Sequence, residues 1–412
     1  MNRTVFIVLA AALAWVPSLP AGSDPLPTVG EWRYVVPPRG NLFEHPPLRA
    51  LALSESKPED VVEEVRYRGT QRRYAQLRYG SPSSVRVTVV LDEVGPYEAD
   101  LYVDTGRNRR IEAKDRVKGE GLTWRLPLEL ALIEGDVLTT VPRTVIFRFG
   151  PVGRILSFAT AGYMEGVVPL TGHTHQARRV DGDGNGQFTD AQDRLWIDLN
   201  DDGRWDGANE QFLYAPILSI AGSRYAVRSD PVGKRLQLAP LEGTGTIQLT
   251  VKPSVPAARV TDLTATLVGR DGSTLSLQGS GVPAVVPTGE YRLACATVVL
   301  EEPHGGPRWT FIFSDSGARQ PARWYTVAKD GSLTIDPIGK LEMRTGLDEP
   351  AVAHPDKDLG FQPKLYTGDG LLIVAGIRGT HESAGGREIR YAELTLTTSE
   401  GTRLASARSG FM

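Results

Sequence analysis

The chain has 412 residues, 44 Gly, 29 Pro and a formal net charge of −3 at pH 7. Its length allows about two to four domains with sizeable cores. The small net charge gives no reason to expect nucleic acid or an anionic membrane as a partner. Abundant Gly and Pro beside 8% aromatic residues are typical of a turn-rich protein built mainly from β-strands.

Residues 1–22 have the pattern of a signal peptide. Arg3 supplies a basic start, an apolar run extends over 5–16, and small residues near Ala21 offer a cleavage site. The apolar run, about 12 residues, is too short to cross a bilayer comfortably, although an uncleaved anchor is the alternative. We therefore expect an extracytoplasmic protein (secreted, periplasmic or cell-surface) with no integral membrane segment after signal cleavage.

The next segment, 23–60, is rich in Pro and weakly patterned, which predicts a linker or an arm lying on a domain. From residue 61 onward, short runs of β-branched and aromatic residues are separated by Gly and Pro. In the run 84–90, SVRVTVV, apolar and polar residues alternate as in a strand with one buried face. We interpret 61–240 as a β domain of sandwich or barrel type with an insert at 181–210.

A second β region, 241–346, contains the pairs Asp271-Gly272 and Asp330-Gly331, which predict hairpin turns. Its run DGSTLSL, followed by VPTGEYRL, resembles the transthyretin-like or peptidase-regulatory-like β-sandwich over about 243–300. That resemblance implies an accessory sandwich and not a catalytic unit.

Cys295 is the only cysteine and lies in the apolar run YRLACATVVL. It cannot form an internal disulfide, and we expect a buried core thiol. The remaining residues, 347–412, predict a C-terminal β segment or a small Ig-like domain.

The acidic stretch 181–210 repeats side-chain oxygens at every second position, twice, with a Gly at each bend. Alternate residues of a tight turn point inward, so these oxygens converge, and Gly permits the backbone angle of the bend. Carboxylates at this density repel one another, and in a folded domain a bound hard cation usually neutralises that repulsion. The candidate metal ligands of the first loop are Asp181, Asp183, Asn185, Gln187, Thr189 and Asp193, and those of the second are Asp198, Asn200, Asp202, Arg204, Asp206 and Glu210. Gln187 and Arg204 would bind through their main-chain carbonyls, and the others through their side chains.

This spacing resembles the calcium loop of EF-hand and dockerin-type proteins, which has oxygens at positions 1, 3, 5, 7 and 9, Gly at 6 and an acid at 12. Both loops depart from it identically, because position 12 is neutral (Gln192, Asn209) and the acid follows at position 13. We therefore expect a variant loop closed at position 13. The close spacing of the loops favours a short shared helix over 189–196 with Thr189 as its N-cap. The resemblance implies bound Ca²⁺; an ion-free acidic turn is the alternative, and Mg²⁺ is disfavoured.

Residues 101–117 align with the second acidic loop and its flanks, and so suggest a third copy. Arg109 stands where the other loops have Gly. We interpret the segment as a decayed relative closed by Arg–Asp pairs, with a working ion site as the alternative, and a true repeat would divide 61–240 into two related halves. Asp104, Asn108, Glu112 and Asp115 keep part of the ligand pattern in this segment.

Asp104-Thr-Gly, after an apolar strand, is the tripeptide of aspartic proteases, whose chemistry needs two aspartates sharing a proton. Arg107 follows it, where pepsin-like and retroviral-type proteases usually have Ser or Ala, and the sequence holds no second such tripeptide. His173 and His175 have a spacing that can hold zinc, but we interpret them as solvated loop histidines. Core packing is the preferred interpretation of the tryptophans, over a carbohydrate platform, for Trp124, Trp196, Trp205, Trp309 and Trp324.

These features together predict an exported, mainly β protein of several β-sandwiches with a short insert of calcium loops and helix. We expect a structural, adhesive or binding role without catalysis, with Ca²⁺ stabilising the fold. A cell-surface protein or a polysaccharide is the candidate partner. The alternatives are a carbohydrate-binding accessory protein and a retropepsin-like aspartic protease that uses Asp104.

Overall fold

The protein is mainly β, as predicted, and its one helical element among the described residues is the 3-10 turn η1 (Ala113–Asp115). In the described part of the chain no helix is long and apolar enough to cross a membrane. The predicted signal peptide, 1–22, lies outside the described residues. The structure, a computed structural model, describes residues 32–410 except 59, 81–85, 135–136, 171, 254–257, 303–307, 316–322, 347–361, 380–386, 390 and 398–399.

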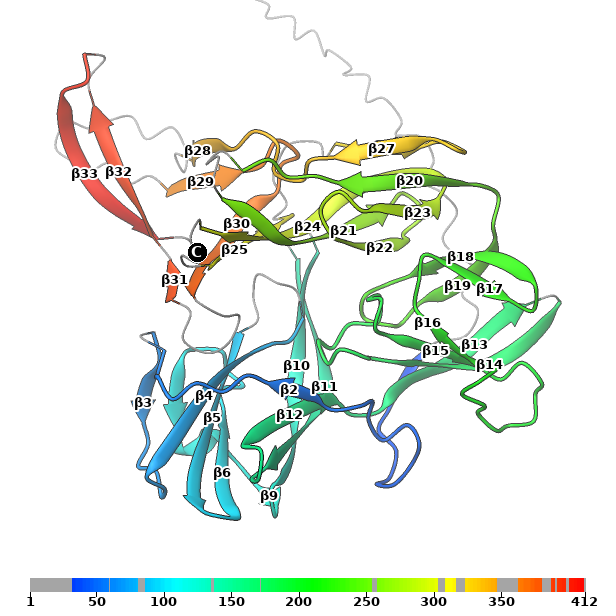
Figure 1. The fold of residues 1–412 in the computed structure, drawn as a ribbon, viewed down its shortest axis with the longest axis horizontal. Coiled ribbons are helices and arrows are strands. Elements are labelled where there is room, and N and C mark those ends of the chain that lie inside the picture. Colours follow the sequence, from blue (N-terminus) through cyan, green and yellow to red (C-terminus); the bar gives the residue numbers. More distant parts are fainter. Residues whose placement is uncertain are drawn as a thin grey trace, which may run out of the picture.

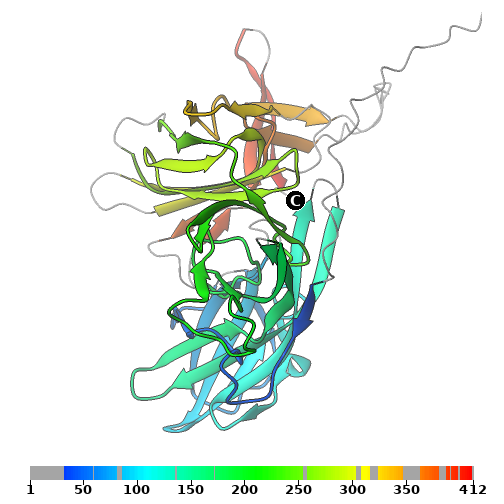
Figure 2. The ribbon, with the colours of Figure 1, turned by 90° about the vertical axis from the view of Figure 1, so that its right-hand side faces the viewer.

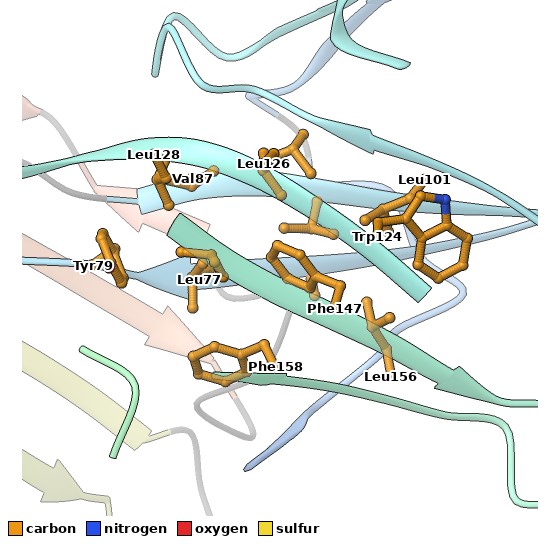
Figure 3. Close-up of a cluster of buried hydrophobic side chains, with 14 of the residues drawn as sticks. Leu77, Tyr79, Val87, Leu101, Trp124, Leu126, Leu128, Phe147, Leu156 and Phe158 are labelled. Atoms are coloured by element: carbon orange, nitrogen blue, oxygen red, sulfur yellow. The ribbon is translucent and has the colours of Figure 1, made fainter. Parts of the chain in front are cut away.

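The first β unit is a sandwich of two antiparallel sheets with the strand orders β4-β5-β6-β8 and β2-β12-β11-β10-β9 (Figure 1). Side chains alternate along β5, so that Val87 and Val89 enter the core between the sheets while Val90 packs on the outer face. Figure 3 shows side chains of both sheets meeting in that core. The strands are β2 (Arg49–Leu51), β4 (Gln71–Arg78), β5 (Arg86–Gly95), β6 (Glu98–Val103), β8 (Arg116–Val117), β9 (Gly119–Glu120), β10 (Thr123–Glu134), β11 (Val137–Gly150) and β12 (Ile155–Thr160).

The segment before residue 61 is an arm that lies across two β units. Its strand β1 (Arg33–Val35) pairs with β13 in the second unit, and β2 pairs with β12 in the first. Trp32 and Phe43 anchor it, because each is less than 5% exposed. Two further short strands, β3 (Val62–Glu64) and β7 (Arg110–Glu112), pair in parallel.

The second β unit contains a five-stranded sheet, β1-β13-β14-β15-β16, and a three-stranded sheet, β17-β18-β19. Strands β13 to β19 are teal to green in Figure 1. A single apolar core combines residues of both sheets. The acidic stretch is therefore not an insert, since it forms the connections from β14 to β15 and from β15 to β16. The strands are β13 (Tyr163–Leu170), β14 (His173–Val180), β15 (Arg194–Ile197), β16 (Gln211–Leu213), β17 (Ile217–Ile220), β18 (Ser223–Ser229) and β19 (Leu236–Pro240).

The third β unit lies above the other two in Figure 2 and contains β23-β20-β27 and a nine-stranded sheet. The main path of that sheet is β22-β21-β24-β25-β30-β29-β28, with β26 beside β24 and β31 beside β30. Three strands of the predicted C-terminal segment, β29, β30 and β31, thus extend the third unit, whereas β32 and β33 form a separate two-stranded sheet among the described residues. The strands are β20 (Thr244–Leu249), β21 (Arg259–Gly269), β22 (Thr274–Gln278), β23 (Pro283–Pro287), β24 (Gly289–Glu301), β25 (Arg308–Ser314), β26 (Tyr325–Val327), β27 (Ser332–Ile335), β28 (Glu342–Gly346), β29 (Gln362–Tyr366), β30 (Leu372–Gly379), β31 (Arg387–Ile389), β32 (Tyr391–Thr397) and β33 (Arg403–Gly410).

Cys295 lies on β24, between its partners on β21 and β25. Burial raises the pKa of its thiol to about 12. The residue as a whole is half-buried, less than the buried core thiol expected. A thiol with so high a pKa is almost never ionised at neutral pH and is therefore a poor nucleophile.

The helix expected over 189–196 is wrong, because a turn leads directly into β15 at Arg194. The carboxylate of Asp193 accepts main-chain hydrogen bonds from Gly182 and Asp190, which fixes a hairpin loop in place of a helical turn. The apolar spacing of TDAQDRLW therefore marks the entry to a strand.

Of the two Asp-Gly pairs, one forms the predicted hairpin and one does not. Asp271-Gly272 joins β21 to its antiparallel partner β22. Asp330-Gly331 connects β26 to β27, which pair with different strands, β24 and β20. This second turn therefore carries the chain from one sheet to the other.

Candidate metal centre

The first acidic loop, 181–193 (loop A), is a hairpin connection closed at its neck by two carboxylates. The register of β14 and β15 places Val180 opposite Arg194, so the next pair is Asp181 opposite Asp193. In loop A the continued strand register therefore brings the opening and closing acids opposite each other. This explains why the acid comes at position 13, because no helix follows to present position 12.

Asp181 organises the loop from inside, with 1% of its surface exposed. Its Oδ1 accepts the main-chain N–H of Gly184 at 2.7 Å, and its Oδ2 accepts that of Gly186 at 2.7 Å. The hydroxyl of Thr160 donates to the same Oδ2 and is itself 3.1 Å from the hydroxyl of Tyr79. Asp181 is thus held by its own loop and by the first β unit.

Asp193 closes the loop and is 2% exposed. Its Oδ1 accepts the N–H of Gly182 at 2.8 Å, and its Oδ2 accepts the N–H of Asp190 at 2.7 Å. One carboxylate therefore joins the start and the end of loop A.

Three carboxylates converge in loop A, since Asp181, Asp183 and Asp193 each offer an oxygen within 4.8 Å of the others. Oxygens bound to one Ca²⁺ at 2.3–2.6 Å are at most about 5 Å apart, so this spacing suits a single ion. No Lys or Arg of the described residues forms an ion pair with any of the three. The cluster is the candidate metal centre.

Burial and mutual repulsion work against ionisation in this cluster. Burial, followed by the charge of Asp181, raises the pKa of Asp183 to about 7. The same two causes in the same order raise the pKa of Asp193 well above its usual range, and burial raises that of Asp181 despite its hydrogen bonds. A bound cation would favour the ionised forms and reverse these shifts.

The other expected ligands of loop A surround this cluster. Asn185 accepts the N–H of Gln187 at 2.7 Å through Oδ1, and its Nδ2 donates to Asp183 at 3.1 Å and to Asp190 at 2.7 Å. Burial raises the pKa of Asp190 to about 6. Thr189 is buried at 3% exposure. Asp190 was not among the predicted ligands, because it occupies position 10, which is not a ligand position of the calcium loop. The only sign of it in the sequence was an acidic residue directly after position 9.

Loop A also lies between the first and second β units. The main-chain N–H of Gly80 donates to the carbonyl of Asn185 at 2.8 Å, and the guanidinium of Arg49 donates to the carbonyl of Gly182 at 2.9 Å. A Cβ added to Gly184 would lie 2.8 Å from the ring of Phe158 in the first core. The loop therefore fits tightly against the first unit.

Phe188, at position 8, fixes the other side of loop A. It is 1% exposed and belongs to the core of the second unit. The guanidinium carbons of Arg143 and Arg179 each lie 5.5 Å from its ring centroid. Arg179 also donates to the carbonyl of Phe188 at 2.5 Å, so two buried cations hold the aromatic ring and the loop backbone.

The second acidic loop, 198–210 (loop B), also opens and closes with an acid, but in a different strand register. Asp198 Oδ2 accepts the N–H of Gly203 at 2.9 Å. Glu210 lies opposite Ile197, one residue further from the opening acid, and its longer side chain accepts the N–H of Leu199 at 3.1 Å and of Asp206 at 2.9 Å. The closing acid at position 13 thus occupies a similar place in both loops.

Loop B does not gather three carboxylates as loop A does among the described residues. Position 3 is the neutral Asn200, whose Nδ2 donates to Asp202 at 3.3 Å. Asp202, Arg204 and Asp206 are exposed, and the carboxylate of Asp206 is occupied by the N–H of Ala208 at 2.8 Å. Loop A is therefore the better candidate.

The expected loop placement is wrong for His173 and His175, because both lie within β14; His173 is exposed there as expected, whereas His175 is buried. His175 is 7% exposed, and its Nδ1 lies 3.0 Å from the carbonyl of Asp198 and 3.1 Å from the carboxylate of Asp201. It supports the opening of loop B. The alternation of residues in HTHQARRV could have predicted a strand that includes both histidines.

Trp205, at position 8 of loop B, contacts Arg178, whose guanidinium carbon is 4.4 Å from its ring centroid. The same guanidinium lies 4.6 Å from the ring of Phe43 and 4.4 Å from that of Tyr163. Arg178 and Arg179 are neighbours on β14 and project from opposite faces of the strand. Arg178 contacts loop B through Trp205, and Arg179 contacts loop A through Phe188. Trp124 and Trp196 are buried, and Trp205, Trp309 and Trp324 are partly buried.

The segment 104–115 (loop C), suggested above as a third copy, has hydrogen bonds of the same kind as those within the acidic loops. Asp104 accepts the N–H groups of Asn108 at 3.1 Å and Arg109 at 2.8 Å, as the opening aspartates do at positions 184–186 and 202–203. Asp115 accepts the N–H of Glu112 at 2.8 Å. Main-chain N–H groups therefore hold both acids of a loop whose ligand pattern is incomplete.

The fold and the site together define a mainly β protein whose hairpin loops carry clustered carboxylates. No protein-family model matches the chain, and no curated protein matches it. Among solved structures, a leucine-rich repeat protein from Bacteroides thetaiotaomicron is similar at 12% identity and a TM-score of 0.17, over 52% of this chain and 24% of that one. A likeness this slight carries no argument about fold or function.

Proposed function

We propose that this is an exported calcium-binding protein with a structural or adhesive role, in which Ca²⁺ at loop A stabilises the fold. The observation that carries the proposal is the convergence of Asp181, Asp183 and Asp193 within 4.8 Å, at a place with little access to water. Unbound carboxylates in that position repel one another, whereas a divalent cation neutralises them.

The position of loop A supports a structural role for the ion. The loop contacts the first unit through Thr160 and Gly80 and the second through Phe188. An ion in loop A would make the turn more rigid, and both units pack against that turn. Calcium would therefore act on the junction between the units as well as on the loop itself.

The experiment is a calorimetric titration of the mature chain with CaCl₂, beside thermal melts in CaCl₂ and in EDTA. Extracellular calcium modules bind at roughly 10⁻⁴–10⁻³ M, so 10 mM Ca²⁺ should stabilise the fold by about 1.4–2.7 kcal/mol. Asp183→Asn should remove the heat of binding assigned to loop A. Asp202→Asn, in exposed loop B, should leave that heat in place.

Two outcomes would reject the proposal. One is an EDTA melt identical to the calcium melt, with no heat of binding. The other is binding that survives in Asp183→Asn and disappears in Asp202→Asn, which would move the site to loop B. Limited proteolysis in EDTA tests the junction, because faster cleavage between the first two units is the expected result.

A further inference from the structure

Loop A contains the pair Asn185-Gly186, and the sequence has no other Asn followed by Gly. Glycine has no side chain to crowd its main-chain nitrogen, so in such a pair this nitrogen can reach the carboxamide carbon of the asparagine. Ring closure between the two atoms expels the amide nitrogen as ammonia. The pair is therefore chemically reactive, and its surroundings decide whether the reaction occurs.

The main-chain nitrogen of Gly186, which would attack, is held by a buried carboxylate. Its N–H donates to Oδ2 of Asp181 at 2.7 Å, and Asp181 is 1% exposed. Gly186 itself is buried. The attack requires a nitrogen that has lost its proton, and a carboxylate acceptor favours the form that keeps it. The closed loop therefore makes this nitrogen a poor nucleophile.

The carboxamide of Asn185, which would be attacked, is held at both ends. Its Oδ1 accepts the N–H of Gln187 at 2.7 Å. Its Nδ2 donates to Asp183 at 3.1 Å and to Asp190 at 2.7 Å. Ring closure moves the carboxamide carbon to bonding distance of the attacking nitrogen and removes Nδ2. The loop must therefore open these contacts before the pair can react.

Both residues of the pair are needed by the folded loop. The φ of Gly186 is +84°, and a Cβ at this position would lie 2.8 Å from Leu130. The amide of Asn185 donates a hydrogen to each of two neighbouring acids, Asp183 and Asp190, whereas a carboxylate there would repel both. The fold thus requires a reactive pair and also protects it.

We propose that Asn185 is a deamidation site that the folded loop A keeps closed, so that opening of the loop alters it irreversibly. On opening, the nitrogen of Gly186 attacks Cγ of Asn185, an N–Cγ bond forms, and the Cγ–Nδ2 bond breaks. The proton of the Gly186 amide leaves with Nδ2 as ammonia, and a succinimide remains. Water then opens either carbonyl of this ring and gives aspartate or isoaspartate. Water is the one co-reactant, and nothing is oxidised or reduced.

The two products would change loop A differently. Loop B already has Asp202 at this position, and its Oδ1 accepts the N–H of Arg204 at 2.7 Å, as Asn185 accepts that of Gln187. Aspartate therefore adds a charge to a loop that can keep its shape. Isoaspartate lengthens the main chain by one carbon and displaces the carbonyl that accepts the N–H of Gly80 at 2.8 Å. This second product would loosen the contact with the first unit.

The test is a peptide map of the mature chain after incubation at pH 8 in CaCl₂, in EDTA, and in EDTA with urea. Trypsin cuts after Arg179 and Arg194, so peptide 180–194 carries Asn185 as its one Asn. The deamidated peptide is heavier by about 1 Da, because an oxygen replaces the amide nitrogen. Two or three hydrogen bonds must open first, so the folded chain should react about 100-fold more slowly than the chain in urea.

Hydrogen exchange at the Gly186 amide measures the opening of the loop without any substitution. Exchange in the folded wild-type chain should be slowed, relative to urea, by about the same factor as deamidation. Further slowing of both processes in CaCl₂ rests on the proposed function. Equal rates in CaCl₂ and EDTA, both far below the rate in urea, would reject calcium at loop A and support protection by the fold alone.

Variants outside the acidic cluster separate the loop from the chemistry. Arg49→Met removes the guanidinium that donates to the carbonyl of Gly182 at 2.9 Å, and should speed deamidation of the folded chain about tenfold. Arg33→Met, on the same arm but at an exposed ion pair, should leave the rate unchanged. Asn185→Gln is the negative control and should leave peptide 180–194 unmodified. Circular dichroism checks that each variant is folded.

Three results would overturn the proposal. One is deamidation of the folded wild-type chain as fast as in urea. Another is deamidation that outpaces exchange of the Gly186 amide, because the reaction would then not depend on opening. The third is an unmodified peptide 180–194 after the chain has stood in urea. A folded Arg49→Met variant that reacts no faster than Arg33→Met would also contradict it.

Discussion

Asp183→Asn should change stability in opposite directions with and without calcium. The side chain accepts the N–H of Asn185 at 3.1 Å through Oδ1, a bond that an asparagine oxygen can keep. What the substitution removes is a negative charge beside Asp181 and Asp193. In EDTA that removal relieves repulsion, whereas in calcium it removes a ligand.

The magnitude follows from the pKa of the Asp183 carboxyl, which rises from 3.8 to about 7. At about 1.4 kcal/mol per unit, ionising this carboxyl in the folded protein costs at most about 4 kcal/mol at pH 8. Part of that cost is repulsion that involves Asp181, and one hydrogen bond from the Asn185 amide is lost, so we expect a gain of about 2 kcal/mol in EDTA. The melting temperature should rise by about 5 °C.

In 10 mM CaCl₂ the advantage of the variant should shrink, and the order should reverse for a dissociation constant near 10⁻⁴ M. The wild-type chain gains up to about 2.7 kcal/mol from a site with a dissociation constant near 10⁻⁴ M, and the variant gains little. Differential scanning calorimetry at pH 8 in both buffers measures the crossing. Asp336→Asn, in an exposed turn of the third unit where Oδ1 accepts the N–H of Ile338, is the matched control and should be neutral in both. A variant less stable than wild type in EDTA would refute the reasoning.

Three further predictions concern the same region. Because the folded-state pKa values of Asp183 and Asp190 are raised, to about 7 and about 6, the metal-free chain should lose stability as pH rises from 5 to 8, and a flat EDTA melting profile over that window would contradict this. Phe188→Ala should cost about 3–5 kcal/mol in chemical denaturation, because it empties a core position between two guanidinium groups, whereas exposed Leu213→Ala should cost little. Gly186→Ala should lower the melting temperature more than Gly203→Ala, because both have positive φ but only the first would place a Cβ 2.8 Å from Leu130; equal effects would show that crowding is not the cause.

Local patterns were enough to predict the fold class and the loops. Alternation around Val87 and Val89 indicated strands with one buried face, and both residues enter a sandwich core. The identical slip of Asp193 and Glu210 to position 13 indicated a regular variant, and each acid does accept hydrogen bonds across its loop. Such features are readable because they depend on residues close in sequence.

Long-range contacts could not be predicted in the same way. The hydrogen-bonded pair Thr160 and Tyr79 reaches Asp181 because the first unit folds against loop A. The residues close to position 181 in the sequence do not predict this contact. The expected helix over 189–196 failed for a related reason, since helical spacing and strand entry look alike in a segment of eight residues. The tertiary hydrogen bonds of Asp193 decide between the two.

The arm that precedes residue 61 gives one strand to each of two sheets, β2 beside β12 and β1 beside β13. A shortened chain that starts at residue 61 would leave main-chain donors and acceptors of both β12 and β13 without a strand beside them. Sheet borders of that kind recruit strands from other molecules. Truncation at this point would therefore cause self-association even though every residue of the acidic loops is retained.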